Sequence, residues 1–291
     1  MQYIKNQLLQ IGVQSTGAEL SSIRSFKTQQ EYMWDAQPAI WGNHAPVLFP
    51  IVGGLKNGEY HYEGKSYPLP RHGFIRYNTQ VELRSQTENR LTYGLSNNHD
   101  TQKVYPFAFD FVIQFELIDN RLTVKHEVHN LDDKPIFFSL GAHPAFRCPL
   151  HEDEAYSDYY LEFDEVENEK TWLLDRAGLI SEEGPLVLDN TNILPLRPNM
   201  FDNDALIFKS MRSRRVSLKS HKSDQALTVS YEGWPYLGVW SKPKAPFVCI
   251  EPWLGIADHS DTDQKIETKF GILTLAPGDT FKAQYSIEIS E

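Results

Sequence analysis

Short runs of alternating apolar and polar residues, separated by turn residues, extend along this whole chain. The stretch FDFVIQFELIDNRLTVKHEVHN, residues 109–130, shows the pattern most clearly, with two alternating arms on either side of Asp119-Asn120. Alternation with a period of two places one face of a strand in a core and the other in solvent. The stretch therefore predicts a long β-hairpin, and the repeated pattern predicts antiparallel sheets.

The same pattern predicts further hairpins on both sides of this stretch. Residues 7–25 alternate around Gly17, which we expect in a turn. Residues 57–69 contain two turn pairs, Asn57-Gly58 and Glu63-Gly64, and Asn-Gly between alternating runs is a strong hairpin signal. Helical periodicity is scarce. The polar segment Glu165–Lys170 is expected to be a strand end or a short turn.

No linker, internal repeat or break in composition divides the chain. Its 17 prolines and 17 glycines are spread along all 291 residues. Strand patterns continue from one end to the other, so we predict a single all-β domain over residues 1–291, with two large sheets packed face to face.

Composition narrows the range of partners. The net charge of −11 argues against nucleic acid, whose phosphates would be repelled. No apolar run approaches the roughly 20 residues that a membrane-spanning helix needs. The N-terminus lacks the features of a secretory signal. The chain has only two cysteines, Cys148 and Cys249, which we expect to be reduced thiols in a cytoplasmic protein.

Three segments place a titratable residue at the end of a strand, beside proline or glycine. They are PLPRHGFIR (68–76), LGAHPAFR (140–147) and CIEPWLGIAD (249–258). Strand ends and loops are where an all-β scaffold usually carries its functional residues. His143 ends an apolar run and precedes a proline, which restricts its backbone. Its imidazole could be a buried, backbone-bonded ring, or a proton donor near neutral pH.

Each of the other titratable residues also has a structural and a functional interpretation. Glu251 follows apolar residues, and could form a structural ion pair or act as a general base whose pKa is raised by burial. Arg71 and His72 could belong to a solvated basic loop. Asp204 opens an apolar run, where a turn or a helix cap is the simplest role.

Metal binding finds little support in the sequence. His126 and His129 are three residues apart on an expected strand and so face opposite sides. No zinc motif with established spacing is present, nor is a phosphate-binding loop or a Gly-x-Ser-x-Gly motif.

Taken together and in this order, the motifs RHGF…R, GAHPAF, NDALIF and EPWLGIAD resemble the aldose 1-epimerase (galactose mutarotase-like) family. The passage APVLFPIVGGLKNGEYHYEGKSYPLPRHGFIR is similar to one bacterial branch of that family, the LacX-like proteins. The resemblance covers most of the chain. It implies a β-supersandwich with a shallow sugar site, and neither a metal nor an organic cofactor.

Carried over residue by residue, the resemblance implies catalytic roles for Glu251 and His143. It implies substrate-binding roles for His72, Arg71 and Asp204. We expect these residues to line one pocket, with His143 and Glu251 no more than about 10 Å apart, since proton transfer needs direct or water-mediated contact. The galactose-specific members carry an Asn-Arg motif before the first histidine. Here that region reads GGLKNGEY, so the preferred sugar is left open.

The function expected from the resemblance is mutarotation of an aldohexose, with Glu251 as base and His143 as acid. One alternative is a sugar-phosphate epimerase, with Arg71, Arg76, Arg147 or Lys56 holding the phosphate. A second alternative is a non-catalytic sugar-binding protein, which would not need both an acid and a base. A third is a glycosidase, which would require two carboxylates flanking the bond, such as Asp204 and Glu251. The expected partner is a monosaccharide, and the expected state is a monomer or a homodimer.

Overall fold

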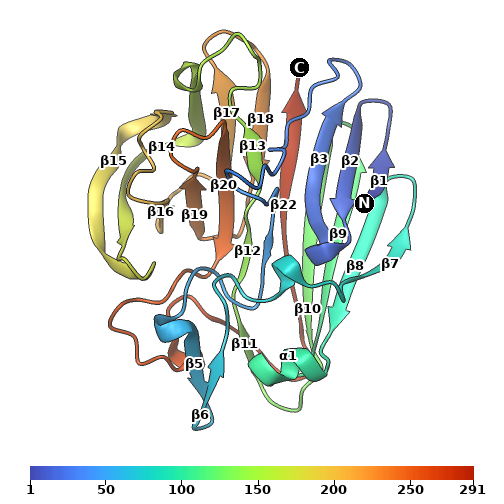
Figure 1. Ribbon diagram of the computed structural model, residues 1–291, viewed down its shortest axis with the longest axis vertical. Helices are drawn as coiled ribbons and strands as arrows, with labels where there is room; N and C mark the ends of the chain where they lie inside the picture. The colour runs from blue at the N-terminus through green and yellow to red at the C-terminus, as the bar shows by residue number, and fades with distance from the viewer.

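The computed structural model describes all residues 1–291 and consists mainly of antiparallel strands (Figure 1). The strands are β1 (Gln2–Lys5), β2 (Leu9–Gln14), β3 (Glu19–Ser25), β4 (Val47–Leu48), β5 (Glu59–Tyr62), β6 (Lys65–Pro68), β7 (Glu82–Gln86), β8 (Arg90–Ser96), β9 (Phe109–Ile118), β10 (Arg121–Asn130), β11 (Ile136–Phe138), β12 (Leu140–Ala142), β13 (Ala145–Arg147), β14 (Tyr159–Leu174), β15 (Ile180–Pro195), β16 (Leu206–Phe208), β17 (Arg215–Ser220), β18 (Ala226–Ser230), β19 (Tyr236–Trp240), β20 (Phe247–Leu254), β21 (Leu273–Leu275) and β22 (Thr280–Ser290).

Helical structure is confined to short segments. The one α-helix is α1 (His99–Val104), which the Asn98 side chain caps by accepting from the backbone N–H groups of Asp100 and Thr101. The 3₁₀ turns are η1 (Thr16–Ala18), η2 (Lys56–Gly58), η3 (Ile75–Tyr77), η4 (Tyr156–Asp158) and η5 (Ile266–Thr268). None of these helices has the length and apolar character that crossing a bilayer requires.

One sheet of 15 strands dominates the molecule. Its neighbours follow the order β4-β12-β20-β19-β16-β14-β17-β18-β22-β10-β9-β8-β7, while β13 pairs with β20 and β15 pairs with β14. A separate sheet of three strands, β1-β2-β3, shares the core with the β7–β10 part of the long sheet. Figure 1 shows β22 running through the middle of the fold, with β1–β3 and β7–β9 on one side and β14–β20 on the other. The all-β sandwich predicted from the sequence is confirmed.

The predicted hairpins are confirmed with one correction. Strands β9 and β10 pair from Ile118↔Arg121 to Phe109↔Asn130, with the turn at Asp119-Asn120. The turn between β5 and β6 is Glu63-Gly64, where both residues have positive φ, as a tight hairpin turn requires. The prediction of a hairpin turn at Asn57-Gly58 was wrong. That pair forms part of η2 because the segment before it is loop, with no strand to pair with β5.

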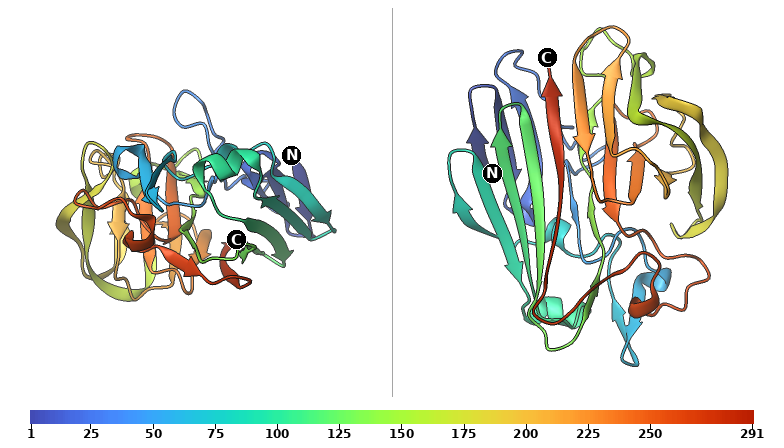
Figure 2. Two further views of the ribbon diagram at one scale, coloured as in Figure 1. Left: turned by 90° about the horizontal axis from the view of Figure 1, so that it is seen from below. Right: turned by 180° about the vertical axis from the view of Figure 1, so that it is seen from behind.

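The longest hairpin corrects a second prediction. Strand β14 has 16 residues and continues straight through Glu165–Lys170, where a strand end or a short turn was expected. The buried carboxylate of Glu167 accepts hydrogen bonds from the backbone and the hydroxyl of Ser213, which explains how a polar segment stays in a strand. Figures 1 and 2 show β15 curving along one edge of the molecule.

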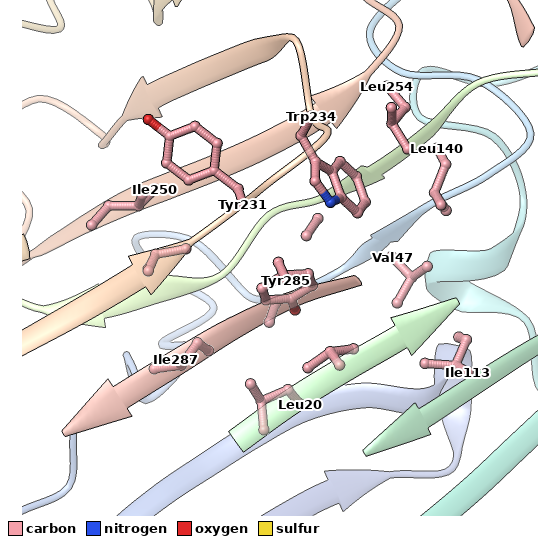
Figure 3. Close-up of a cluster of buried hydrophobic side chains, with 14 of the residues drawn as sticks. Leu20, Val47, Ile113, Leu140, Tyr231, Trp234, Ile250, Leu254, Tyr285 and Ile287 are labelled. Carbon is pink, nitrogen blue, oxygen red and sulfur yellow. The ribbon is translucent and has the colours of Figure 1, made fainter. Parts of the chain in front are cut away.

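The core joins strands that are far apart in the sequence. Figure 3 shows side chains of β3, β9, β20 and β22 directed into one interior, among them Leu20, Ile250 and Ile287. The indole of Trp234 lies in this cluster and donates its N–H to the carbonyl of Gln284 at 2.7 Å. Burying an aromatic ring of this size contributes strongly to stability, and its polar atom is satisfied at the same time. This core holds β20, which carries Glu251, in a fixed position.

Candidate active site

The backbone of β20 and of the β12–β13 segment brings His143 and Glu251 face to face. Strand β12 pairs with the far end of β20, β13 pairs Ala145 with Cys249, and the N–H of Ile250 donates to the carbonyl of Pro144 at 3.2 Å. Residues 143 and 251 are therefore cross-strand neighbours. His143 Nε2 lies 3.2 Å from Glu251 Oε2, which confirms the expected proximity of the two groups. Both side chains are buried.

A tight turn presents His72 to the same place. His72 and Gly73 both have positive φ, 69° and 74°. A Cβ on Gly73 would lie 2.1 Å from the carbonyl oxygen of Phe49, so only glycine fits there. The N–H of Gly53 donates to His72 Nδ1 at 3.1 Å. Nδ1 is therefore the acceptor, and a neutral His72 carries its proton on Nε2. His72 can then only donate from Nε2.

Asp204 and Arg71 lie at the exposed side of the site. Asp204 has a positive φ of 77° in the turn before β16, and its own Oδ1 accepts from the N–H of Ala205 at 2.8 Å. The turn role considered from the sequence is therefore present, and the carboxylate still lines the pocket. Arg71 donates from Nη2 to the carbonyl of Ala177 at 3.3 Å, which holds its guanidinium beside the pocket.

These five residues line one pocket of about 230 Å³. All of the site residues expected from the sequence are brought together in it. The complete lining is Trp41, Gly53, Arg71, His72, Arg76, His143, Leu174, Gly178, Asp204, Ala205, Ile207, Trp240, Glu251, Trp253 and Ala257. A pocket with apolar walls and a few converging polar groups is typical of small-molecule sites.

Sequence reasoning missed the aromatic wall of this pocket. Trp41 stacks on the His143 ring, with centroids 5.0 Å apart, and Trp240 meets the same ring edge-on at 5.7 Å. The backbone carbonyl of Trp41 accepts the indole N–H of Trp34 at 2.8 Å, which fixes the loop. Trp41 lies in a loop without periodicity, so no sequence signal pointed to it. Trp253 lies two residues after Glu251 in the EPW motif and could have been found there.

Arg76 is a second residue that the site prediction did not include. The arginines that form ion pairs with carboxylates are Arg84, Arg90, Arg121 and Arg147. Arg71 and Arg76 line the pocket and are not among them. The pocket therefore contains two guanidinium groups whose charge no carboxylate of the chain neutralises through an ion pair.

Burial shifts the proton affinities of the central groups in opposite directions. Burial raises the pKa of Glu251 well above its ordinary value, and the nearby charge of Asp204 raises it further. Burial lowers the pKa of His143, to which the positive charge of Arg76 also contributes. Burial and the charges of His143, Arg76 and Arg71 lower the pKa of His72. Burial therefore disfavours the charged form of both members of the His143–Glu251 pair.

Several buried polar atoms around this pair have no hydrogen-bond partner within the chain. They are His143 Nδ1 and the indole N–H of Trp253, and Glu251 Oε2 has only its 3.2 Å ion-pair contact with His143 Nε2. Almost all buried polar groups in folded proteins are paired, so unpaired ones that converge on a pocket indicate a polar ligand. One group of residues here also has the composition of a metal site, namely His143, Cys249 and Glu251.

Comparison with known proteins agrees with the fold. The family model described as aldose 1-epimerase matches residues 2–288. Protein LacX of Lactococcus lactis subsp. lactis is 34% identical over 98% of each chain. The structure of a galactose mutarotase related enzyme from Lactobacillus acidophilus is 36% identical, with a TM-score of 0.94 over 100% of this chain and 97% of that one.

A galactose mutarotase-like protein from Lactobacillus casei is 29% identical, with a TM-score of 0.93 over 100% of both chains. The family model and the LacX relative each extend over nearly the full length, so the likeness includes every segment that contributes to the pocket. This chain, with its antiparallel β-sandwich and its buried histidine and glutamate in one pocket, belongs to the aldose 1-epimerase family and is similar to its LacX members.

Proposed function

We propose that the protein is a mutarotase that interconverts the α and β anomers of an aldohexose by opening and closing the sugar ring. One observation carries the proposal: an imidazole and a carboxyl group lie 3.2 Å apart in a pocket of monosaccharide size. Ring opening needs one proton taken from the hydroxyl group on C1 and one given to the ring oxygen. Both oxygens are bonded to the same carbon, so two adjacent groups suffice.

The proposed cycle is balanced in protons. The Glu251 carboxylate takes the C1 hydroxyl proton while protonated His143 gives a proton to the ring oxygen, and the C1–O bond breaks. The open-chain aldehyde turns its other face toward the departing oxygen. Glu251 then returns its proton to the carbonyl oxygen, and His143 takes back the proton of the attacking hydroxyl group. No net proton is consumed, and no other reactant is needed.

The proposed cycle requires that His143 and Glu251 together hold one proton. Ring opening starts with the proton on His143 and ends with it on Glu251. The opposing pKa shifts in the free protein favour the proton on Glu251. The catalytic assignment therefore requires that the proton move to His143 across the 3.2 Å contact when sugar binds. The two states titrate as one coupled pair.

The other polar residues would orient the sugar. We assign His72 Nε2–H as a donor to a sugar oxygen, because its Nδ1 is already engaged by Gly53. Asp204 and Arg71, at the exposed side, would bind hydroxyl groups remote from C1. Trp41 and Trp240 form an apolar wall against which the face of a sugar ring can pack.

Polarimetry on freshly dissolved α-glucose and α-galactose tests the proposal. We expect the approach to anomeric equilibrium to accelerate in proportion to enzyme concentration, with no hydrolysis of a chromogenic glycoside. Binding of sugar without acceleration would instead support a sugar-binding protein. Hydrolysis of the glycoside would support a glycosidase and contradict the proposal.

A second candidate function is mutarotation of a hexose phosphate. Arg71 and Arg76 line the pocket without ion-pair partners, and guanidinium groups bind phosphate well. Comparing kcat/KM for glucose and glucose 6-phosphate separates the two substrates. If phosphate is recognised, Arg76→Leu should lower kcat/KM for the phosphorylated sugar by roughly 10-fold or more and leave that for glucose nearly unchanged, since an ionic hydrogen bond contributes about 1.5–3 kcal/mol.

A further inference from the structure

The thiol of Cys249 has no role in the proposed proton transfers, although it lies beside the groups that perform them. Cys249 and Glu251 are two apart on β20, so their side chains lie on the same face of the strand. His143 is the cross-strand neighbour of Glu251. The ligand atoms of His143, Cys249 and Glu251 all lie within 4.8 Å of one another, and all three residues are buried.

We propose that His143, Cys249 and Glu251 form an inhibitory metal site that takes a thiophilic divalent cation such as Zn²⁺ or Cd²⁺ in competition with the catalytic proton. The inhibition rests on the function proposed above, whereas the metal site itself does not. The site would combine one imidazole nitrogen, one thiolate sulfur and one carboxylate oxygen, which is a set of zinc ligands.

The distances fit such a site after small side-chain movements. Bonds of about 2.0–2.3 Å in a tetrahedral zinc site place ligand atoms about 3.3–3.8 Å apart. His143 Nε2 and Glu251 Oε2 are already 3.2 Å apart. The widest separation in the group is at most 4.8 Å, so the thiol would have to approach by about 1 Å. The fourth position would face the pocket and take a water molecule.

Charge balance favours a divalent ion at this buried position. Burial raises the pKa of the Cys249 thiol and that of the Glu251 carboxyl, so burial favours the protonated form of both groups. Binding of M²⁺ would release these two protons to solvent and form one thiolate and one carboxylate. The resulting unit of M²⁺, thiolate, carboxylate and neutral imidazole has no net charge, which avoids a large desolvation cost.

Metal binding at this position would stop catalysis directly. The cation would occupy Oε of Glu251 and Nε2 of His143, the atoms that exchange protons with the sugar. Because two protons leave on binding, affinity should increase with pH. Hard cations such as Mg²⁺ prefer oxygen ligands and should not compete.

The second cysteine of the chain provides a matched control. Cys148 is also a free and fully buried thiol, but it does not belong to the ligand group. Neither cysteine is assigned to the catalytic or sugar-binding machinery, so Cys249→Ala and Cys148→Ala should both retain basal activity.

The experiment is a titration of the metal-free protein with Cd²⁺, followed by the ultraviolet charge-transfer absorption of a cadmium–thiolate bond. We expect one equivalent of absorption in the wild type and in Cys148→Ala, and none in Cys249→Ala. Calorimetry with Zn²⁺ should show an affinity at least about 10-fold lower for Cys249→Ala, since even the loss of an outer-shell partner has effects of this size. Mg²⁺ should give no signal.

His143→Asn keeps the thiol and removes one ligand, so it tests the site even if Cys249→Ala does not fold. It should bind Zn²⁺ more weakly than the wild type. The proposal is overturned if the wild type shows no cadmium–thiolate band, if Cys148→Ala loses the band, or if His143→Asn binds Zn²⁺ as tightly as the wild type does. Absorption and calorimetry do not depend on turnover, so a protein without mutarotase activity would contradict the proposed function and leave this test intact.

Discussion

At the scale of single residues, opposite responses to burial make His143 and Glu251 an acid–base pair. A buried carboxyl group holds its proton more tightly, and a buried imidazole holds its proton less tightly. The pKa of Glu251 therefore rises while that of His143 falls to about 3, so without substrate the proton favours Glu251. At 3.2 Å the two groups are close enough to exchange this proton, and the proposed reaction requires bound sugar to shift it to His143.

Replacing either member of this pair should reduce turnover more than binding. Glu251→Gln keeps the shape and removes the proton acceptor, and His143→Asn keeps a polar side chain that cannot carry a proton. We expect each change to lower kcat by roughly 10²-fold or more. The double variant should be little slower than either single one, because the two groups act as a unit. Polarimetry measures kcat and calorimetry measures sugar affinity. Unchanged turnover together with lost binding would make Glu251 a binding residue.

Asp204→Asn should affect both binding and the pH dependence. The negative charge of Asp204 raises the pKa of Glu251, so its removal should lower that pKa. Glu251 must give up its proton before it can act as base, so a lower pKa should move the acidic limb of the kcat/KM profile to lower pH. KM should increase, since a positioning group is lost. Asp202→Asn, an exposed position in the same turn but outside the pocket, is the control and should leave the profile in place.

At the scale of elements, strand β10 shows how alternation along a strand places two histidines on opposite faces, one buried and one partly exposed. His126 is buried and stacks between the rings of Phe111 and Tyr285, at 6.2 Å and 6.0 Å. His129, three residues on, lies on the other face and is partly exposed. The expectation that these two histidines do not share a metal site is consistent with this arrangement. Burial lowers the pKa of His126 to about 3.

This buried ring should make the fold sensitive to acid. The folded pKa of about 3 lies below the unfolded value of 6.5, so the folded state binds fewer protons between these pH values. Stability from this group is then present above pH 6.5 and decreases as the pH falls. His126→Phe, which retains the stacking, should reduce the loss in the free energy of unfolding between pH 7 and pH 4 by about 3 kcal/mol. Urea denaturation at pH 7 and pH 4 measures this loss in the free energy of unfolding, with His129→Gln as the control. Equal losses in all three proteins would contradict the expectation.

The local sequence pattern predicts individual strands and hairpins correctly. It fails where contacts with distant segments determine the local structure. Alternation predicted the β9–β10 hairpin and its turn because both are encoded within 22 consecutive residues. The residues Asn57-Gly58 predicted a hairpin turn that does not form. A hairpin needs a strand on both sides of its turn, and no strand directly precedes this pair. Glu165–Lys170 continues a strand because it pairs with β15 and because Ser213, far along the chain, donates to the buried Glu167.

At the scale of the whole molecule, the site is assembled from segments that span the length of the chain. The motifs with histidine and glutamate were predictable because their order and wording resemble those of the family. The strand-end position expected for Glu251 was wrong, since it lies within β20. Trp41 was not, since it reaches the pocket from a loop that no local pattern marks, and Arg76 was considered only as a phosphate-binding residue. Which residues converge depends on sheet order, and no local pattern encodes that order.

We also expect the whole protein to work without a resident metal. Exhaustive dialysis against EDTA should leave mutarotation rates unchanged or higher, because the proposed proton transfers involve only side chains of the chain. Higher activity would indicate that traces of metal had occupied the pocket. Loss of activity that Zn²⁺ or Mg²⁺ restores would show that a cation takes part in the reaction. Polarimetry before and after dialysis, with metal content measured in parallel, distinguishes these results.

The central position of β22 also has a consequence for how this protein is made. This strand pairs with β10 on one side and with β18 on the other, and so joins the two parts of the long sheet. It is synthesised after every other strand. A nascent chain can form the β7–β10 ladder once residue 130 has been added and the β17–β18 ladder once residue 230 has been added, but each keeps an open edge until β22 follows. Open edges invite pairing with other chains. The first half-sheet therefore stays exposed to wrong pairing for more than half of synthesis, and the sandwich closes in a late step.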